Sequence, residues 1–109
     1  MGGRVSYLGE FKQVVLLAVA RLKHEAYGMR LRAEIAERTG RDTSIGAIYA
    51  TLDRLVAKGH LRTRDDDSGG RARRFFLLTP SGVEALEASR ELQARMWDGV
   101  RLQKTGRRS

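Results

Sequence analysis

Residues 44–79 constrain the fold of this chain most, because they predict an amphipathic helix followed by a basic β-hairpin. Apolar side chains between Ile45 and Val56 recur at the spacing of one helical face. Ser44 is a good N-cap for this helix, with Thr43 as a competitor one residue earlier. Gly59 suits the left-handed backbone position that ends many helices. The pattern therefore predicts a helix that ends sharply before the hairpin.

The face of this helix opposite the apolar stripe is suited to close contact with a partner. Gly46 and Ala47 are small, so the backbone can approach closely, and Tyr49 adds a hydroxyl and a flat ring. Arg54 lies further along the helix and is expected to bind a phosphate. A helix N-terminus also carries free N–H groups and partial positive charge, which favour an anion. Together these features predict a helix that enters the major groove of DNA.

The hairpin that follows is rich in arginine. Alternation over Leu61–Arg64 places Arg62 and Arg64 on one face of the first strand. The run DDDSGG at 65–70 predicts the connecting loop, and FFLL at 75–78 predicts the second strand. Because DNA would repel the aspartates, we expect the loop apex to point away from a duplex. The arginines after the loop are the expected phosphate contacts: Arg71, Arg73 and Arg74.

Two long apolar helices predict an obligate homodimer. The helix expected over Leu8–Lys23 is apolar around most of its circumference, which is typical of a helix buried on more than one side. The last helix, opened by Thr79 and Pro80, is expected to run to about Gln103, although little chain remains for it to pack on. A second subunit would cover both surfaces. The expected contacts between subunits are Phe11, Val15, Leu92, Met96 and Val100.

Two features leave alternatives open. Trp97 lies one step off the apolar stripe of the last helix. It either packs in the dimer core or, with Met96 and Val100, lines a site for a planar hydrophobic ligand. Along the expected helix Gly28–Thr39, three arginines either touch phosphates or lie on a solvated face where pairing with Glu34 supports the helix. The arginines concerned are Arg30, Arg32 and Arg38.

The composition favours nucleic acid as a partner and excludes several classes of site. The chain has 109 residues and a net charge of +8, and 17 of its 21 cationic side chains are arginine, whose planar fork suits phosphate and guanine. The absence of cysteine excludes disulfides and thiolate metal sites. His24 and His60 are far apart in sequence, and Asp65–Asp67 lacks an EF-hand pattern. We therefore expect neither an enzyme nor a bound metal or cofactor.

Nothing in the sequence predicts a membrane or export role. Met1–Arg4 lacks the apolar core of a signal peptide. The longest nearly apolar run, Val14–Ala20, is too short to span a bilayer. We expect a cytoplasmic protein of one domain, with a basic, disordered tail at Lys104–Ser109.

Four segments carry a family resemblance: LGEFKQVVLLAVARL (8–22), AYGMRLRAEIAERTG (26–40), TSIGAIYATLDRLVAKGHL (43–61) and GGRARRFFLLTPSG (69–82). Through them the chain resembles the PadR family of bacterial transcriptional regulators. The resemblance implies a mainly α-helical winged helix-turn-helix with a small β-hairpin and a C-terminal dimerisation helix over about 80–103. It also implies a homodimer that binds double-stranded DNA and represses nearby promoters, and it makes release by a small hydrophobic or planar ligand plausible.

The resemblance assigns roles to residues that match the family's pattern. Tyr49 matches its recognition-helix tyrosine, and Tyr27 with Gly28 matches the pair that opens the second helix. Phe75-Phe76 departs from the Tyr-Tyr that is frequent in the family, which removes two hydroxyls. The alternative function is a winged-helix module that binds RNA or a protein partner. The expected DNA-binding set is Tyr27, Thr43, Ser44, Gly46, Ala47, Tyr49, Arg54, Arg71, Arg73 and Arg74.

Overall fold

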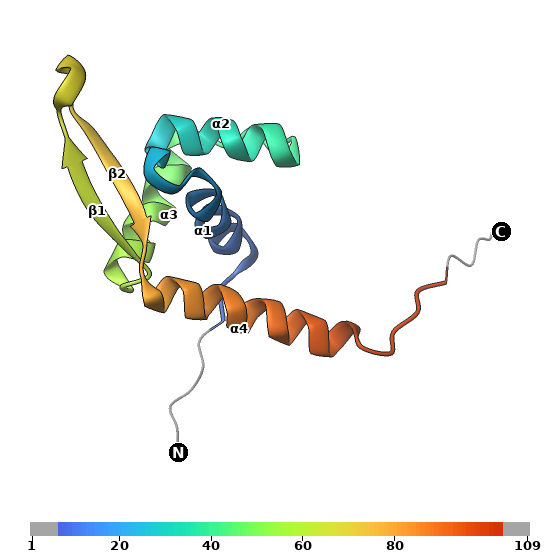
Figure 1. Cartoon of the computed structure of the whole chain (residues 1–109). Helices are drawn as coiled ribbons and strands as arrows, with labels where there is room; N and C mark the ends of the chain where they lie inside the picture. The colour runs from blue at the N-terminus through green and yellow to red at the C-terminus, as the bar shows by residue number, and fades with distance from the viewer. Residues whose placement is uncertain (1–6, 104–109) are drawn as a thin grey trace.

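The computed structural model describes residues 7–103, which form four α-helices and one antiparallel hairpin (Figure 1). The predicted fold class, mainly α with a small β-hairpin, is confirmed. The expectations for Met1–Arg4 and Lys104–Ser109 lie outside the described residues. The elements in chain order are α1 (Glu10–Leu22), the 3-10 turn η1 (Lys23–Glu25), α2 (Gly28–Thr39), α3 (Ile45–Ala57), β1 (Leu61–Asp66), the 3-10 turn η2 (Ser68–Gly70), β2 (Arg73–Leu78) and α4 (Pro80–Trp97).

One apolar core joins the first three helices to the base of the hairpin. Phe76 on β2 is the largest fully buried side chain, and its backbone N–H donates to the carbonyl of Ala26 over 2.8 Å. From this anchor the hairpin projects past the helices at its tip (Figure 1). The other large, fully buried side chains of this core come from α1, α2 and α3: Val15, Leu16, Val19, Leu31, Ile48, Leu52 and Leu55.

Local signals set both ends of α3, as predicted. The hydroxyl of Ser44 accepts a hydrogen bond from the N–H of Ala47 over 3.1 Å. The helix ends at Ala57, and Gly59 takes a φ of 83°, which is the left-handed conformation that glycine adopts at least cost. The N–H of His60 then bonds back to the carbonyl of Leu55 over 2.9 Å. The chain therefore turns directly from α3 into β1.

The hairpin differs from the prediction at its acidic run. Asp65 and Asp66 belong to β1 and pair with Arg74 and Arg73 across the ladder, so they are not loop residues. Opposite charges that face each other across two strands stabilise the pairing, and this extends the strand beyond the apolar alternation. The turn itself is η2, in which Gly69 and Gly70 both have positive φ.

The junction between α3 and α4 depends on a close approach of backbones. Thr79 caps α4, since its hydroxyl accepts from the N–H of Gly82 over 3.1 Å, and the same hydroxyl donates to the carbonyl of Gly59 over 2.6 Å. A side chain at Gly82 would meet the backbone carbonyl of His60. Only glycine therefore allows the first turn of α4 to lie against the end of α3.

The last helix is shorter than predicted. α4 ends at Trp97, and Gly99 has a φ of 79°, so Val100 and Leu102 lie beyond the helix. The apolar spacing continues to Val100, but the left-handed glycine breaks the helix before that residue. Gly82, Ala85 and Ser89 in the first half of α4 are buried, whereas its C-terminal end extends away from the body (Figure 1). Within residues 7–103, no helix is long and apolar enough to cross a membrane.

Candidate nucleic-acid interface

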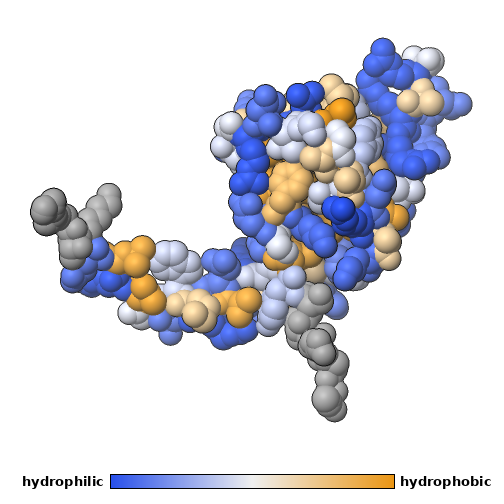
Figure 2. Space-filling view, turned by 180° about the vertical axis from the view of Figure 1, so that it is seen from behind, coloured by the Kyte–Doolittle hydropathy of each residue, from blue (hydrophilic) through white to orange (hydrophobic). Residues whose placement is uncertain are grey.

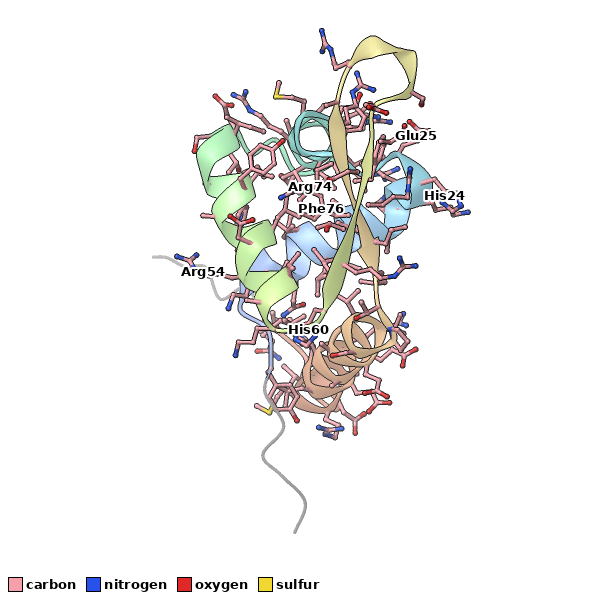
Figure 3. The ribbon with its side chains drawn as sticks, turned by 90° about the vertical axis from the view of Figure 1, so that its left-hand side faces the viewer. His24, Glu25, Arg54, His60, Arg74 and Phe76 are labelled. Atoms are coloured by element: carbon pink, nitrogen blue, oxygen red, sulfur yellow. The ribbon has the colours of Figure 1, made fainter. Side chains whose placement is uncertain are left out.

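The N-terminal half of α3 exposes the small face that the sequence predicts. Gly46, Ala47 and Ala50 are exposed, and Tyr49 is 41% exposed. Arg54 is also exposed and points outward from α3, away from the hairpin (Figure 3). Apart from Tyr49, this face carries only small side chains near the start of the helix, so a duplex could approach the helix backbone closely.

The Tyr49 ring packs in the space left by a glycine on another helix. The tyrosine ring lies against Gly28 at the start of α2, so closely that a Cβ on Gly28 would overlap the phenol oxygen. Gly28 has a negative φ and is not required by its backbone conformation. A side chain at this position would displace the end of the Tyr49 side chain, and no spacing rule in the sequence predicts this contact.

Aromatic and guanidinium groups stack at the side of the hairpin. The Tyr27 ring lies 5.5 Å from that of Phe75 in an edge-to-face arrangement. The guanidinium of Arg73 lies 4.2 Å above the Tyr27 ring centroid, and that of Arg64 lies 4.6 Å above the Phe75 ring. Cation–π contacts of this kind orient arginines while leaving their N–H groups accessible. Tyr27 therefore positions Arg73.

A hollow of about 610 Å³ lies between α3 and the hairpin; we call it the α3–hairpin hollow. Its lining residues are Tyr49, Asp65, Asp66, Asp67, Ala72, Arg73 and Arg74. The expectation that the loop apex points away from a duplex stays a prediction. The carboxylates of Asp65, Asp66 and Asp67 themselves lie on the side of the hairpin near α3. They are retained there by internal partners, since Arg74 Nε donates to Asp65 over 3.1 Å and Arg64 to Asp66 over 3.2 Å. Hydrogen bonds from Ser68, then from Arg64, lower the pKa of Asp66.

The comparison with family models identifies this arrangement. The model of the PadR-like family of transcriptional regulators matches residues 16–88, from α1 through most of α4. The chain belongs to this family. In this winged-helix arrangement α3 stands in the place of the recognition helix, and the hairpin stands in the place of the wing.

Relatives agree with this assignment. The transcriptional regulator Rv3488 of Mycobacterium tuberculosis is 40% identical over 67 residues, which is 62% of either chain, so the match spans less than two thirds of that relative. A PadR family transcription regulator from Clostridium difficile superposes with a TM-score of 0.69 at 20% identity, covering 81% of this chain and 92% of that one. A winged-helix DNA-binding protein from STIV gives a TM-score of 0.68 at 23% identity, covering 88% and 100%. The fold is a winged helix.

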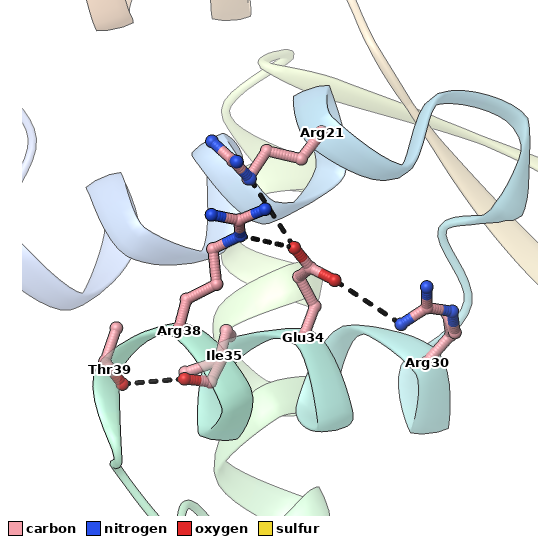
Figure 4. A network of polar contacts seen from close by, with 6 residues as sticks. All are labelled: Arg21, Arg30, Glu34, Ile35, Arg38 and Thr39. Atoms are coloured by element: carbon pink, nitrogen blue, oxygen red, sulfur yellow. Dashed lines mark hydrogen bonds and ion pairs between the residues drawn. The ribbon is translucent and has the colours of Figure 1, made fainter.

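Two of the three α2 arginines, Arg30 and Arg38, pair with Glu34, as the second alternative expected, and Arg32 does not. Glu34 is only 8% exposed and accepts from Arg38 over 2.9 Å, with Arg30 at 3.4 Å and Arg21 of α1 at 3.5 Å (Figure 4). The Arg38 hydrogen bond holds the pKa of the Glu34 carboxyl below its usual range. Arg32 instead donates to the Thr43 carbonyl over 2.8 Å, which fixes the turn between α2 and α3.

The residues predicted to join subunits fall into three groups by exposure: buried, half-buried and exposed. Val15 is completely buried in the core of its own chain, so its assignment to a dimer contact is wrong, and Leu17 on α1 is 49% exposed instead. Phe11 and Leu92 are half-buried. The remaining candidates lie at the end of α4, where Met96 is 71% and Trp97 55% exposed, and Val100 beyond the helix is also exposed.

Apolar side chains are grouped on this projecting end of the chain (Figure 2). Periodicity could not distinguish Val15 from Leu17, because both lie on a helix that is apolar nearly all round. No group of His, Asp and Glu within residues 7–103 could hold a metal ion.

The Glu34 cluster predicts a pH dependence of stability. Because the pKa of Glu34 is lowered in the folded state, its ionised form stabilises the fold at pH values above the ordinary value of 4.5, and this contribution disappears as the pH falls through the lowered pKa. We expect Glu34→Gln to lower the melting temperature at pH 7. The gap to the wild type should shrink towards about pH 3.

The matched control is Glu37→Gln, which changes an exposed carboxylate on the same helix. Its gap to the wild type should be small at every pH. Thermal unfolding followed by circular dichroism measures both variants. A Glu34→Gln gap that stays constant between pH 7 and about pH 3 would contradict the assigned role of this carboxylate.

Proposed function

We propose that this PadR-family protein is a homodimeric, sequence-specific DNA-binding repressor of nearby genes. The observation that carries the proposal is the exposed face of α3, with Tyr49 held against Gly28 beside an arginine-rich wing. A helix with a small exposed face fits the major groove, where base edges can be distinguished. The wing then lies along the duplex backbone, where arginines contact phosphates.

Dimerisation gives the interaction its geometry. Each subunit would place one α3 in a major groove, and a twofold axis would set half-sites ~34–36 Å apart. The projecting end of α4 supports this assembly, because Met96 and Trp97 are large apolar side chains that a single chain leaves in water. Leu17 on α1 and the half-buried Phe11 and Leu92 would extend the contact.

A small hydrophobic or planar effector could act at the same end of α4. Trp97 offers a flat apolar wall, and Met96 and Val100 are exposed beside it in sequence. An effector bound between the two copies would change the angle between subunits and so the distance between the recognition helices. DNA release would follow from the lost half-site spacing, without any direct contact between effector and duplex.

The first test concerns Tyr49. We expect Tyr49→Ala to weaken binding to a fragment from upstream of the protein's own gene, measured by gel shift. Its melting temperature should fall less than that of Leu52→Ala, since a core truncation costs about 2–5 kcal/mol. Tyr49→Phe is the matched control that separates the ring from the hydroxyl. A Tyr49→Ala protein as unstable as Leu52→Ala would show that Tyr49 is mainly a structural residue.

The second test concerns assembly. Sedimentation at micromolar concentration should give a species of twice the 12.2 kDa chain mass. The substitutions Met96→Asp and Trp97→Asp place charges at the exposed end of α4 and should shift the protein towards monomer. They should also lower its stability, because folding and association are coupled in an obligate dimer. A folded wild-type monomer under these conditions would overturn the dimer and the half-site geometry together.

The third test concerns the wing. Arg71→Ala with Arg73→Ala should remove about two phosphate contacts per subunit, so the slope of log K against log salt should flatten by roughly 3–4 for a dimer. Discrimination between operator and random DNA should change much less, because phosphates carry no base identity. If the double variant loses base preference while the salt slope stays the same, these two arginines contact base edges instead.

A further inference from the structure

One ion pair of the wing faces the recognition helix. Arg74 and Asp65 are cross-strand partners, and Arg74 Nε donates to Asp65 Oδ1 over 3.1 Å. Strand alternation puts them on the same hairpin face as the buried Leu61 and Phe76. Nearer the tip this face leaves the core, and the pair lines the α3–hairpin hollow beside Tyr49. Figure 3 shows Arg74 at the hairpin on the side of α3.

The charge of this hollow is unsuited to phosphate. Three carboxylates, those of Asp65, Asp66 and Asp67, line it against the two guanidiniums of Arg73 and Arg74. Because Arg64 pairs with Asp66, the local charges cancel, in a chain whose net charge is +8. A backbone phosphate in the hollow would gain little net attraction, because the carboxylates offset the guanidiniums, whereas a neutral base edge needs only the hydrogen-bond donors that Arg74 offers.

Arg74 is oriented for such an edge. Its Nε is engaged by Asp65, and the arginine side chain is 59% exposed. The terminal amino groups are the part of the guanidinium that can make a bidentate contact to O6 and N7 of guanine. An arginine already fixed by a carboxylate loses less rotamer freedom when it binds. The carboxylate therefore orients the donor and offsets its attraction for phosphates.

We propose that Arg74 recognises a guanine edge beside α3 and that Asp65 is the positioning residue that fixes it there. This inference rests on the proposed DNA-binding function. It assigns base contact to the face of the wing near α3 and phosphate contact to the opposite face. Arg62 lies on the opposite face of β1, and Arg71 lies between η2 and β2, so we expect these two residues to contact the phosphate backbone. Arg74 alone among the wing arginines is paired to an aspartate across the ladder on the side of α3.

Selection of bound duplexes from a randomised DNA library tests the proposal, with the full chain as wild type, Asp65→Asn, Arg74→Ala and Arg62→Ala. The wild-type motif should contain a guanine in each half-site. Preference for it should fall about tenfold or more in Arg74→Ala. It should also fall in Asp65→Asn, whose affinity for random DNA should rise because one carboxylate is lost. Arg62→Ala, the control from the opposite face, should weaken all sequences alike.

Two further variants separate positioning from a general effect on the wing. Asp65→Glu should restore most of the guanine preference, because it keeps a carboxylate near Arg74. In an Arg74→Ala background, Asp65→Asn should leave base preference unchanged, since Asp65 acts through Arg74. Melting temperatures should stay close to the wild type, because both side chains are largely exposed. Arg74→Lys replaces Arg74→Ala should the latter fail to fold, since lysine keeps the charge but not the bidentate fork.

The proposal is overturned if Arg74→Ala weakens all sequences equally, as Arg62→Ala does, because Arg74 would then be a phosphate contact. It is also overturned if Asp65→Asn keeps the full motif. If the wild type selects a motif and both Asp65→Asn and Arg74→Ala select the same motif, the proposed function stands and only this inference is removed. A wild-type protein that selects no motif overturns sequence-specific binding itself, and the inference with it.

Discussion

The burial of Phe76 is the constraint on which the functional surface depends. A two-stranded hairpin is marginally stable in water, so the wing has no fixed direction of its own. Phe76 and Leu61 insert into the helical core, and the Phe76 N–H bonds to the Ala26 carbonyl over 2.8 Å. These contacts fix the angle between the wing and α3. The proposed DNA contacts require that angle, because recognition helix and wing must meet one duplex at the same time.

The arginines of this protein have two different roles, and composition alone does not tell which arginine has which role. Some neutralise or stabilise parts of the fold, as Arg38 does at Glu34 and Arg32 at the turn before α3. Others are stacked or paired on the wing, as Arg73 is over Tyr27. A net charge of +8 therefore overstates the number of phosphate contacts that a duplex would find. What matters for DNA binding is which guanidiniums lie on the α3 and wing side, and how each is held.

The sequence predicted the parts of the fold that local chemistry decides. Ser44 and Gly59 bound α3 because capping depends on a few neighbouring residues. The prediction failed where the sequence could not tell a subunit contact from the core of the same chain. Val15 lies on a helix that is apolar nearly all round, so its spacing fits either surface, and the structure places it in the core. The prediction also extended α4 to Gln103, because a stripe of apolar residues continues past the glycine that ends the helix. The partners of Asp65 and Gly28 follow from pairing and packing in three dimensions, which no spacing rule contains.

The junction at the end of α3 explains how an event at the far end of α4 could reach DNA. The Thr79 hydroxyl donates to the carbonyl of Gly59 over 2.6 Å, and the Thr79 N–H donates to the carbonyl of His60 over 3.2 Å. The ring of His60, which Figure 3 labels, lies 2.9 Å from the Ser81 hydroxyl. Burial lowers the pKa of His60, so this contact is made by the neutral ring near pH 7. α4 and α3 are therefore joined without a flexible linker. A helix of 18 residues is about 27 Å long, so a change of roughly 10° in the angle between the α4 helices of a dimer would displace one recognition helix relative to the other by about 5 Å. That displacement exceeds the rise of one base pair, about 3.4 Å, and so suffices to move α3 out of register with its half-site.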